Sequence, residues 1–292
     1  MKKLLVTGAS GFLGWNICNR IQKDFEIFGT VFSNPLEING VKIISLDLTN
    51  FNDLKRIFKE VDPDGAIHTA AESRPEFCQT RPTESSKINV EATVNLAGLC
   101  ADRKIPFVFT STDLVFDGHN APYRESDPVS PINIYGEQKV LAEEKVLNIY
   151  SNSAVCRMPM MFGLASPAYN TFFQQTVTAL QEGRELTLFT DEFRTPISGY
   201  TATKGLMLAL KKAQGLIHLG GRERISRYAF GKVIADIMGY SMDRIIACKQ
   251  KDVKLSVPRA ADLTLDSTLA FSLGFNPPTL TEELQSLLSN SL

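Results

Sequence analysis

The sequence predicts an α/β fold in which a doubly wound parallel sheet is joined to a smaller, partly intertwined C-terminal domain. Short apolar segments alternate with helix-periodic segments through the first half of the chain, which implies parallel strands joined by right-handed crossovers. The apolar segments are hydrophobic throughout, as expected when helices cover both faces of a sheet. A glycine-rich turn separates the first strand from the first helix, as in sheets that bind a ligand at their carboxyl edge.

Each expected element follows from its own segment of the chain. Apolar runs predict strands over residues 3–7, 26–32, 41–46, 66–69, 107–111 and 154–158. Between them, apolar residues at helical spacing predict helices over residues 11–23, 49–60, 84–102 and 135–150. The helix over 49–60 starts at Thr49, whose hydroxyl can cap its first turn.

After residue 162 the alternation gives way to mainly helical segments. We expect helices over residues 171–182, 201–213, 228–238 and 281–289, and one more strand over 216–220 that returns to the main sheet. We therefore place a dinucleotide-binding domain at residues 1–162, to which residues 197–221 return, and a substrate-binding region at 163–292.

The composition excludes several classes of protein. Among 292 residues, 31 Lys and Arg oppose 32 Asp and Glu, so the net charge of −1 favours neither a nucleic-acid partner nor a membrane surface. No apolar run approaches the ~20 residues that span a bilayer. The five cysteines are widely spaced and include no C-x-x-C pair, which argues against disulfides and zinc and fits a reducing cytoplasm.

The turn over residues 7–14 has the chemistry of a dinucleotide-binding loop of the Rossmann type. Gly8 permits the tight turn, Gly11 lets the backbone approach a pyrophosphate, and Gly14 allows close packing of helix on strand. The helix that follows, opening with Phe12 and Leu13, presents free N–H groups and a partial positive charge to the phosphates.

The end of the second strand indicates which dinucleotide is bound. A carboxylate ~20 residues after the glycines would hydrogen-bond the ribose 2′-hydroxyl of NAD, but Ser33 and Asn34 stand there instead. Neither repels a 2′-phosphate and both can donate hydrogen bonds, which favours NADP, with NAD as the alternative. Asp47 is placed either to meet the adenine edge or to form a turn at the start of the next helix.

Tyr135 and Lys139 stand four residues apart on one helical face. A lysine close to a tyrosine favours the phenolate, so we expect Lys139 to lower the pKa of Tyr135. Thr112 lies at the end of a parallel strand, where a doubly wound sheet places its site, and its hydroxyl could hold a carbonyl oxygen.

Beyond these patterns, nearly the whole chain resembles the extended short-chain dehydrogenase/reductase superfamily, and more narrowly the dTDP-4-dehydrorhamnose reductase group. The matching stretches are residues 7–14, 70–71, 111–118, 135–139, 157–159, 194–196, 258–259 and 265–267. The segment Ser111-Thr112-Asp113-Leu114-Val115-Phe116-Asp117-Gly118 is the most specific of them, although Leu114 replaces the tyrosine common in the group.

The resemblance implies a role for each catalytic residue. Tyr135 would donate a proton, Lys139 would hold the nicotinamide ribose, and Thr112 would polarise the substrate carbonyl. The implied reaction is hydride transfer from NADPH to the C4 ketone of a nucleotide-linked 6-deoxysugar. The expected substrate contacts are Glu72, Thr112, Asp113 and Arg194. The expected cofactor contacts are Gly8, Ser10, Gly11, Phe12, Leu13, Ser33, Asn34, Asp47, Leu48, Thr69, Ala70, Ala71, Asn89, Tyr135, Lys139 and Met158.

Other interpretations stay open on the sequence. Some members of the group bind magnesium through a glutamate after a Gly-Trp pair, but Asn16 follows Gly14-Trp15 here, so no such metal site is expected. Residues 68–76, with 117–118 and 122–125, resemble the β regulatory subunit of methionine adenosyltransferase, which implies an NADP-binding partner protein without catalysis. A nucleotide-sugar epimerase or dehydratase is a third alternative. The helices over 84–102 and 135–150 are compatible with a homodimer and equally with exposure to solvent.

Overall fold

The computed structural model describes residues 1–34, 36–167, 169 and 171–289. Its centre is a seven-stranded sheet in the order β11-β6-β5-β4-β1-β2-β3, with every neighbouring pair parallel. The strands are β1 (Lys2–Thr7), β2 (Phe25–Val31), β3 (Val41–Ser45), β4 (Gly65–His68), β5 (Phe107–Thr112), β6 (Ala154–Met158) and β11 (Gly215–His218). The predicted fold class is confirmed, and so is the late strand that rejoins the sheet.

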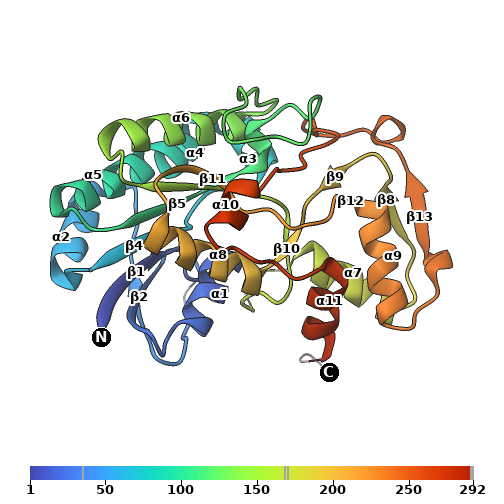
Figure 1. Ribbon diagram of the computed structural model, residues 1–292, viewed down its shortest axis with the longest axis horizontal. Coiled ribbons are helices and arrows are strands. Elements are labelled where there is room, and N and C mark those ends of the chain that lie inside the picture. The colour runs from blue at the N-terminus through green and yellow to red at the C-terminus, as the bar shows by residue number, and fades with distance from the viewer. Residues whose placement is uncertain (35, 168, 170, 290–292) are drawn as a thin grey trace.

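Helices cover both faces of this sheet (Figure 1). One face carries α1 (Phe12–Arg20), α8 (Gly199–Lys212) and α10 (Thr268–Ser272), and the other carries α2 (Phe51–Val61), α5 (Thr93–Arg103) and α6 (Ile134–Ile149). Each face has its own apolar core, which explains why the strands are hydrophobic on both sides. Ile17 and Leu206 lie in the first core, whereas Leu96 and Phe109 lie in the second.

Two helix predictions differ from the structure in detail. Helix α2 is capped by Asn50 rather than Thr49, because the Asn50 side chain accepts a hydrogen bond from the N–H of Asp53. The helix expected over 84–102 is three segments: α4 (Pro82–Ser86), a π-helical turn (Lys87–Ala92) and α5. Wide turns of this kind often occur at functional sites.

The remaining elements gather at one end of the sheet (Figure 1). Helices α7 (Phe172–Gln181), α9 (Arg227–Ile237) and α11 (Leu280–Ser289) share a third apolar core. Three small sheets were not predicted: β7 (Met161–Phe162) with β10 (Ile197–Ser198), β8 (Leu186–Phe189) with β13 (Ile245–Cys248), and β9 (Phe193–Arg194) with β12 (Ile225–Ser226). Most of these strands have two residues, too few to show a period. Short helical segments complete the chain: α3 (Pro75–Thr80) and 3-10 turns at Asp113–Val115, Met242–Arg244 and Gln250–Asp252.

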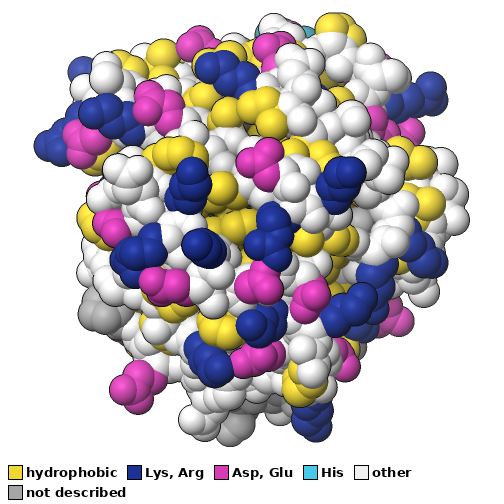
Figure 2. Space-filling model, turned by 90° about the vertical axis from the view of Figure 1, so that its left-hand side faces the viewer, with side chains coloured by type: hydrophobic (Ala, Val, Ile, Leu, Met, Phe, Trp, Pro, Cys, Tyr) yellow, Lys and Arg dark blue, Asp and Glu magenta, His cyan; other side chains and the backbone are white. Residues whose placement is uncertain are grey.

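The surface mixes charges of both signs. Figure 2 shows basic and acidic side chains interspersed over the face that carries α2, with apolar side chains scattered between them. Across the described part of the chain, no helix combines the length and the apolar character needed to cross a bilayer.

Candidate active site

A cleft of about 850 Å³ opens where the central strands end. The predicted cofactor residues that line it are Gly8, Ser10, Gly11, Phe12, Leu13, Ser33, Asn34, Asp47, Leu48, Thr69, Ala70, Ala71, Tyr135, Lys139 and Met158. These side chains come from six parts of the sequence, and the sheet brings them together because parallel strands end at the same edge.

The glycine turn at the floor of this cleft is shaped for close approach. Gly8 has φ of +73°, and a Cβ there would lie 2.8 Å from the backbone of Ala70. A Cβ on Gly14 would lie only 2.2 Å from the carbonyl oxygen of Gly8. Gly11 caps α1 without a side chain, so the first turn of the helix is open to an anion. Side chains at Gly8 and Gly14 would strike the backbone of Ala70 and of the turn itself, and the open first turn of α1 fits a dinucleotide pyrophosphate.

The end of the cleft beyond β2 is lined by the residues expected to contact the adenosine half of the dinucleotide. Ser33 and Asn34 line it beside Phe32, a residue that the sequence analysis did not single out and whose side chain is 67% exposed. Asp47 also lines the cleft, while its Oδ1 accepts hydrogen bonds from both the N–H and the hydroxyl of Thr49. Asp47 thus forms the turn at the start of the next helix, and because it also lines the cleft its contact with adenine stays a prediction.

Asn89 lies behind the cleft rather than in its lining. Its side-chain amide donates to the carbonyl of Glu72 and to Oε1 of Gln138, and its Oδ1 accepts from the N–H of Glu72. The side chain is fully buried. This placement does not favour direct contact of Asn89 with the cofactor. Instead, its two hydrogen bonds to the backbone of Glu72 hold the segment that begins there.

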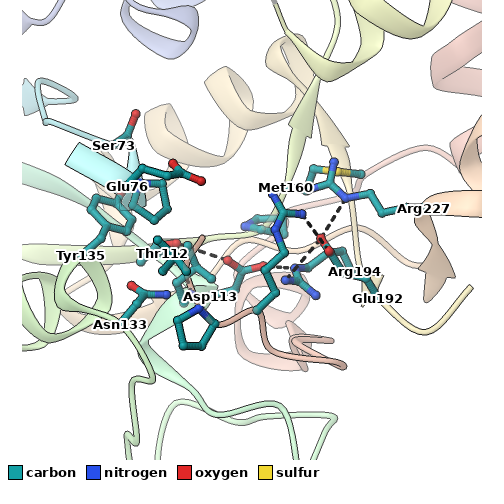
Figure 3. Close-up of a pocket in the computed structure, with 16 residues that line it drawn as sticks. Ser73, Glu76, Thr112, Asp113, Asn133, Tyr135, Met160, Glu192, Arg194 and Arg227 are labelled. Atoms are coloured by element: carbon teal, nitrogen blue, oxygen red, sulfur yellow. Dashed lines mark hydrogen bonds and ion pairs between the residues drawn. The ribbon is translucent and has the colours of Figure 1, made fainter. Parts of the chain in front are cut away.

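A second, smaller cleft of about 290 Å³ adjoins the first (Figure 3). Thr112, Asp113 and Arg194 line it as expected, but Glu72 lies in the larger cleft, where it binds Arg74. Its lining also includes side chains that the sequence analysis did not assign to the site, among them Ser73, Glu76, Asn133, Glu192, Arg227 and Arg259.

Three arginines surround one buried carboxylate in the smaller cleft. Glu192 is 1% exposed and accepts from Arg227 Nε at 3.0 Å and Arg259 Nη1 at 2.9 Å, with Arg194 Nη2 at 3.7 Å. Burial alone would raise the pKa of Glu192, but the three guanidiniums hold it below its usual value. The sequence around Glu192 does not reveal Arg227 and Arg259 as its partners, because they lie 35 and 67 residues away along the chain.

Arg194 is engaged by the protein itself. Its Nε lies 3.3 Å from Asp113 Oδ2, and its Nη1 donates to the carbonyl oxygen of Phe193. Burial raises the pKa of Asp113 to about 6, against the opposing effect of Arg194. These bonds fix the guanidinium in the wall of the smaller cleft, and its contact with a substrate stays a prediction.

Tyr135 stands where the two clefts meet, since it lines both. Helix α6 reaches this point because Asn133 caps it through the N–H of Gly136, and Gly136 packs on the carbonyl of Leu114, which a Cβ would approach to 2.3 Å. In Figure 3 the Tyr135 ring lies beside Ser73 and Glu76, with Thr112 and Asp113 between it and the arginines.

The expected effect of Lys139 on Tyr135 is wrong for this structure. Burial raises the pKa of Tyr135 well above its usual value, and the charges that act on it raise it further. Burial also lowers the pKa of Lys139 to about 8, and its Nζ donates to the carbonyl oxygen of Thr110 at 3.0 Å. Spacing alone could not reveal this, because the separation of two residues along a helix does not show how deeply the phenol is buried.

Thr112 holds the start of the next turn. Its Oγ1 donates to Asp113 Oδ1 at 3.2 Å and accepts from the N–H of Leu114 at 3.2 Å. The hydroxyl lies in the smaller cleft, and turning it from Asp113 would offer its proton to a ligand.

The position of a magnesium-binding glutamate in some relatives is taken by Asn16. Its amide donates to the carbonyl oxygens of Phe12 and Leu164, which a carboxylate cannot do. Over residues 1–34, 36–167, 169 and 171–289, no three His, Cys, Asp or Glu side chains lie together as a metal site.

These features place the protein among the extended short-chain dehydrogenases/reductases, a class of NAD(P)-dependent oxidoreductases. Comparison with known proteins identifies the group more narrowly: the chain belongs to the RmlD substrate binding domain family, whose profile matches residues 1–292.

Individual relatives span almost the whole chain. The probable low-salt glycan biosynthesis reductase Agl14 of Haloferax volcanii is 28% identical over 287 residues, 97% of this chain and 96% of that protein. Methionine adenosyltransferase 2 subunit beta of Pongo abelii is 29% identical over 95% of this chain and 84% of its own length. Among solved structures, dTDP-4-dehydrorhamnose reductase of Bacillus anthracis in complex with NADP has a TM-score of 0.86 at 21% identity and covers 99% of both chains. The resemblance stated from the sequence motifs is confirmed.

Proposed function

We propose that the protein is an NADPH-dependent reductase of a nucleotide-linked 4-keto-6-deoxysugar. The observation that carries this proposal is the position of Tyr135 between two clefts, with Lys139 in the larger and Thr112 in the smaller. Reduction of a carbonyl requires a proton donor that reaches both the cofactor and the substrate, and Tyr135 lies between the cleft proposed for the dinucleotide and the cleft proposed for the sugar.

Each residue has a role in the proposed reaction. The reduced nicotinamide, when bound, supplies a hydride to the carbonyl carbon. Tyr135 donates its proton to the carbonyl oxygen, so that the ketone becomes a secondary alcohol. The raised pKa of Tyr135 keeps that proton in place until the oxygen gains negative charge. Thr112 turns its hydroxyl from Asp113 to hydrogen-bond the same oxygen.

The cofactor proposal is NADP rather than NAD. Ser33 and Asn34 line the cleft without a carboxylate that would repel a 2′-phosphate. The Bacillus anthracis reductase of similar fold was crystallised with NADP, which agrees with this choice. The division into a dinucleotide-binding domain, residues 1–162 with 197–221, and a substrate-binding region, 163–292, belongs to the same proposal. So does the contact of Ser10, Thr69, Ala71 and Met158 with the cofactor.

The proposal is tested by mixing the purified protein with NADPH and dTDP-4-dehydrorhamnose. We expect the nicotinamide absorbance to fall in proportion to the sugar added. An epimerase or dehydratase returns its cofactor after each turnover, so it would leave the absorbance unchanged while the sugar is converted. No conversion, with NADP bound, would refute the reductase proposal.

A second candidate is an NADP-binding partner of a methionine adenosyltransferase. The relative that supports it is the Pongo abelii subunit beta, at 29% identity over nearly the whole chain. Pull-down with the methionine adenosyltransferase of the same organism tests it. A stable complex, together with no consumption of NADPH, would favour this candidate, and no complex at micromolar concentration would reject it.

A further inference from the structure

A buried chain of hydrogen bonds runs under the floor of the larger cleft. Thr7 Oγ1 lies 2.6 Å from His68 Nδ1, His68 Nε2 lies 2.9 Å from Thr93 Oγ1, and Thr93 Oγ1 lies 2.9 Å from the carbonyl oxygen of Asn89. None of these four residues is more than 1% exposed. The chain thus crosses from the end of β1, through the end of β4, to the π-helical turn.

The donor and acceptor in each of these hydrogen bonds can be assigned by starting from the Asn89 carbonyl oxygen. The Asn89 carbonyl can only accept, so Thr93 gives it the hydroxyl proton and must accept from His68 Nε2. His68 therefore carries its proton on Nε2, which leaves Nδ1 bare to accept from the Thr7 hydroxyl. The oxygen of Thr7 in turn accepts from the N–H groups of Thr69 and Ala70, at 3.2 and 3.3 Å.

This series of hydrogen bonds joins the segments that form the larger cleft. Thr7 precedes Gly8, and Ala70 is the residue whose backbone a Cβ on Gly8 would strike. At the other end, the Asn89 side chain holds Glu72 and reaches Gln138 on α6. Thr7 therefore joins the glycine turn to the segment after β4 through two groups: its carbonyl oxygen accepts from the Thr69 hydroxyl at 2.6 Å, and its hydroxyl, oriented by His68, accepts from the N–H groups of Thr69 and Ala70.

The surroundings keep the ring of His68 neutral. The rings of Phe107 and Phe109 stack on it with centroids 6.4 and 5.9 Å away, and its burial lowers its pKa to about 3. Lys139 on α6 is the charged group that acts on it, and its positive charge contributes to this lowered pKa. A ring that stays neutral keeps one donor and one acceptor at all ordinary pH values.

We propose that His68 is a positioning residue, which in its Nε2–H form orients Thr7 and so holds the 69–71 segment at the distance from the glycine turn that a nicotinamide dinucleotide requires. This inference rests on the proposed cofactor. His68 itself contacts neither cofactor nor substrate, and it affects the affinity for the dinucleotide through Thr7.

The first test reads the ring directly, without cofactor. In the ¹⁵N spectrum of protein labelled at histidine, the bare nitrogen of a neutral ring resonates well downfield of the nitrogen that bears the proton. The His68 signals are assigned by their loss in His68→Asn. We expect a bare Nδ1 and a protonated Nε2 whose shifts do not change between pH 8 and pH 5. A protonated Nδ1, or an imidazolium near pH 7, would overturn the proposal.

The second test measures NADPH affinity by fluorescence titration. Thr7→Val removes the acceptor of two half-buried N–H groups and the hydroxyl that His68 orients, so we expect affinity to fall about tenfold or more. His68→Leu should weaken binding by a similar factor, whereas His68→Asn keeps an acceptor near the Nδ1 position and should bind within about threefold of the wild type. Thr176→Val is the matched control, because Thr176 is equally buried and its hydroxyl donates within its own helix, to the carbonyl of Phe172. It should leave NADPH affinity unchanged.

The outcomes separate this inference from the proposed function. Wild-type protein that binds neither NADPH nor NADH refutes both. Wild-type binding with undiminished affinity in Thr7→Val, or equal losses in His68→Asn and His68→Leu, refutes the positioning role alone. Tight NADPH binding without turnover would refute the reductase proposal and leave the positioning role standing.

Discussion

Substituting Gly14 by alanine tests how tightly the glycine turn is packed. A Cβ there would lie 2.2 Å from the Gly8 carbonyl oxygen, which falls 0.8 Å short of the 3.0 Å that real Cβ contacts respect, and 2.9 Å from Thr69 Oγ1. The neighbours are mostly backbone, so α1 would have to withdraw from the turn. We expect overpacking to cost about 3 kcal/mol, offset by the ~1 kcal/mol that alanine gains over glycine inside a helix.

The matched control is Gly98→Ala on α5, where a Cβ would meet nothing within 4 Å. That variant should gain ~1 kcal/mol from helix propensity alone. The two variants should therefore differ by about 3 kcal/mol in the free energy of unfolding, or by roughly 6 °C or more in Tm. Denaturation in urea and thermal melts measure this difference, and NADPH titration should show weakened binding for Gly14→Ala only. If both variants are equally stable and bind NADPH alike, the reasoning about the turn is wrong.

Four other predictions follow from the clefts. Tyr135→Phe should lower turnover by about 10²-fold or more while NADPH affinity, measured by titration, stays within a few-fold of the wild type. Ser33→Asp should weaken NADPH relative to NADH by about tenfold or more, because its carboxylate repels the 2′-phosphate; an unchanged ratio of the two Kd values would contradict the cofactor proposal. Glu192→Gln should destabilise the fold by about 3 kcal/mol, since it removes the buried carboxylate that pairs with Arg227 and Arg259. The pKa of Glu192 is lowered in the folded state, so the stability it contributes is present above its unfolded pKa and lost as pH falls through the folded value; urea denaturation of the variant at falling pH should show a smaller loss than the wild type. Lys139 has a folded pKa of about 8, below its unfolded value of 10.5, so its own titration adds stability between pH 8 and about 10.5 because the unfolded chain binds this proton more tightly; the free energy of unfolding of the wild type, taken relative to that of Lys139→Met in urea curves, should therefore rise across that range.

The parts of the fold that could be predicted are those with local signals. Strands β1 and β5 each contain a three-residue apolar run, residues 4–6 and 107–109, and α6 is capped by Asn133, so their existence follows from short stretches of sequence. The two-residue strands β9 and β12 have no such signal, because they form only when residues 193–194 and 225–226 meet in space. The π-helical turn is equally invisible, since its apolar residues fit an ordinary helix.

The same distinction divides the site. The glycine turn and the Tyr135–Lys139 pair are local patterns, and both lie in the cleft at the strand ends. The arginines around Glu192 depend on contacts across 35 and 67 residues, which spacing cannot reveal. The pKa of Tyr135 was expected to fall and instead rises, because it depends on how deeply α6 buries the phenol rather than on the lysine one turn away.

The most direct test of the proposed function is the consumption of NADPH during reduction of dTDP-4-dehydrorhamnose. The proposed function predicts one NADPH oxidised per sugar reduced by the wild type, and almost none by Tyr135→Phe under the same conditions. A flat nicotinamide absorbance with wild-type protein that retains bound NADP would contradict it, and so would undiminished turnover in Tyr135→Phe.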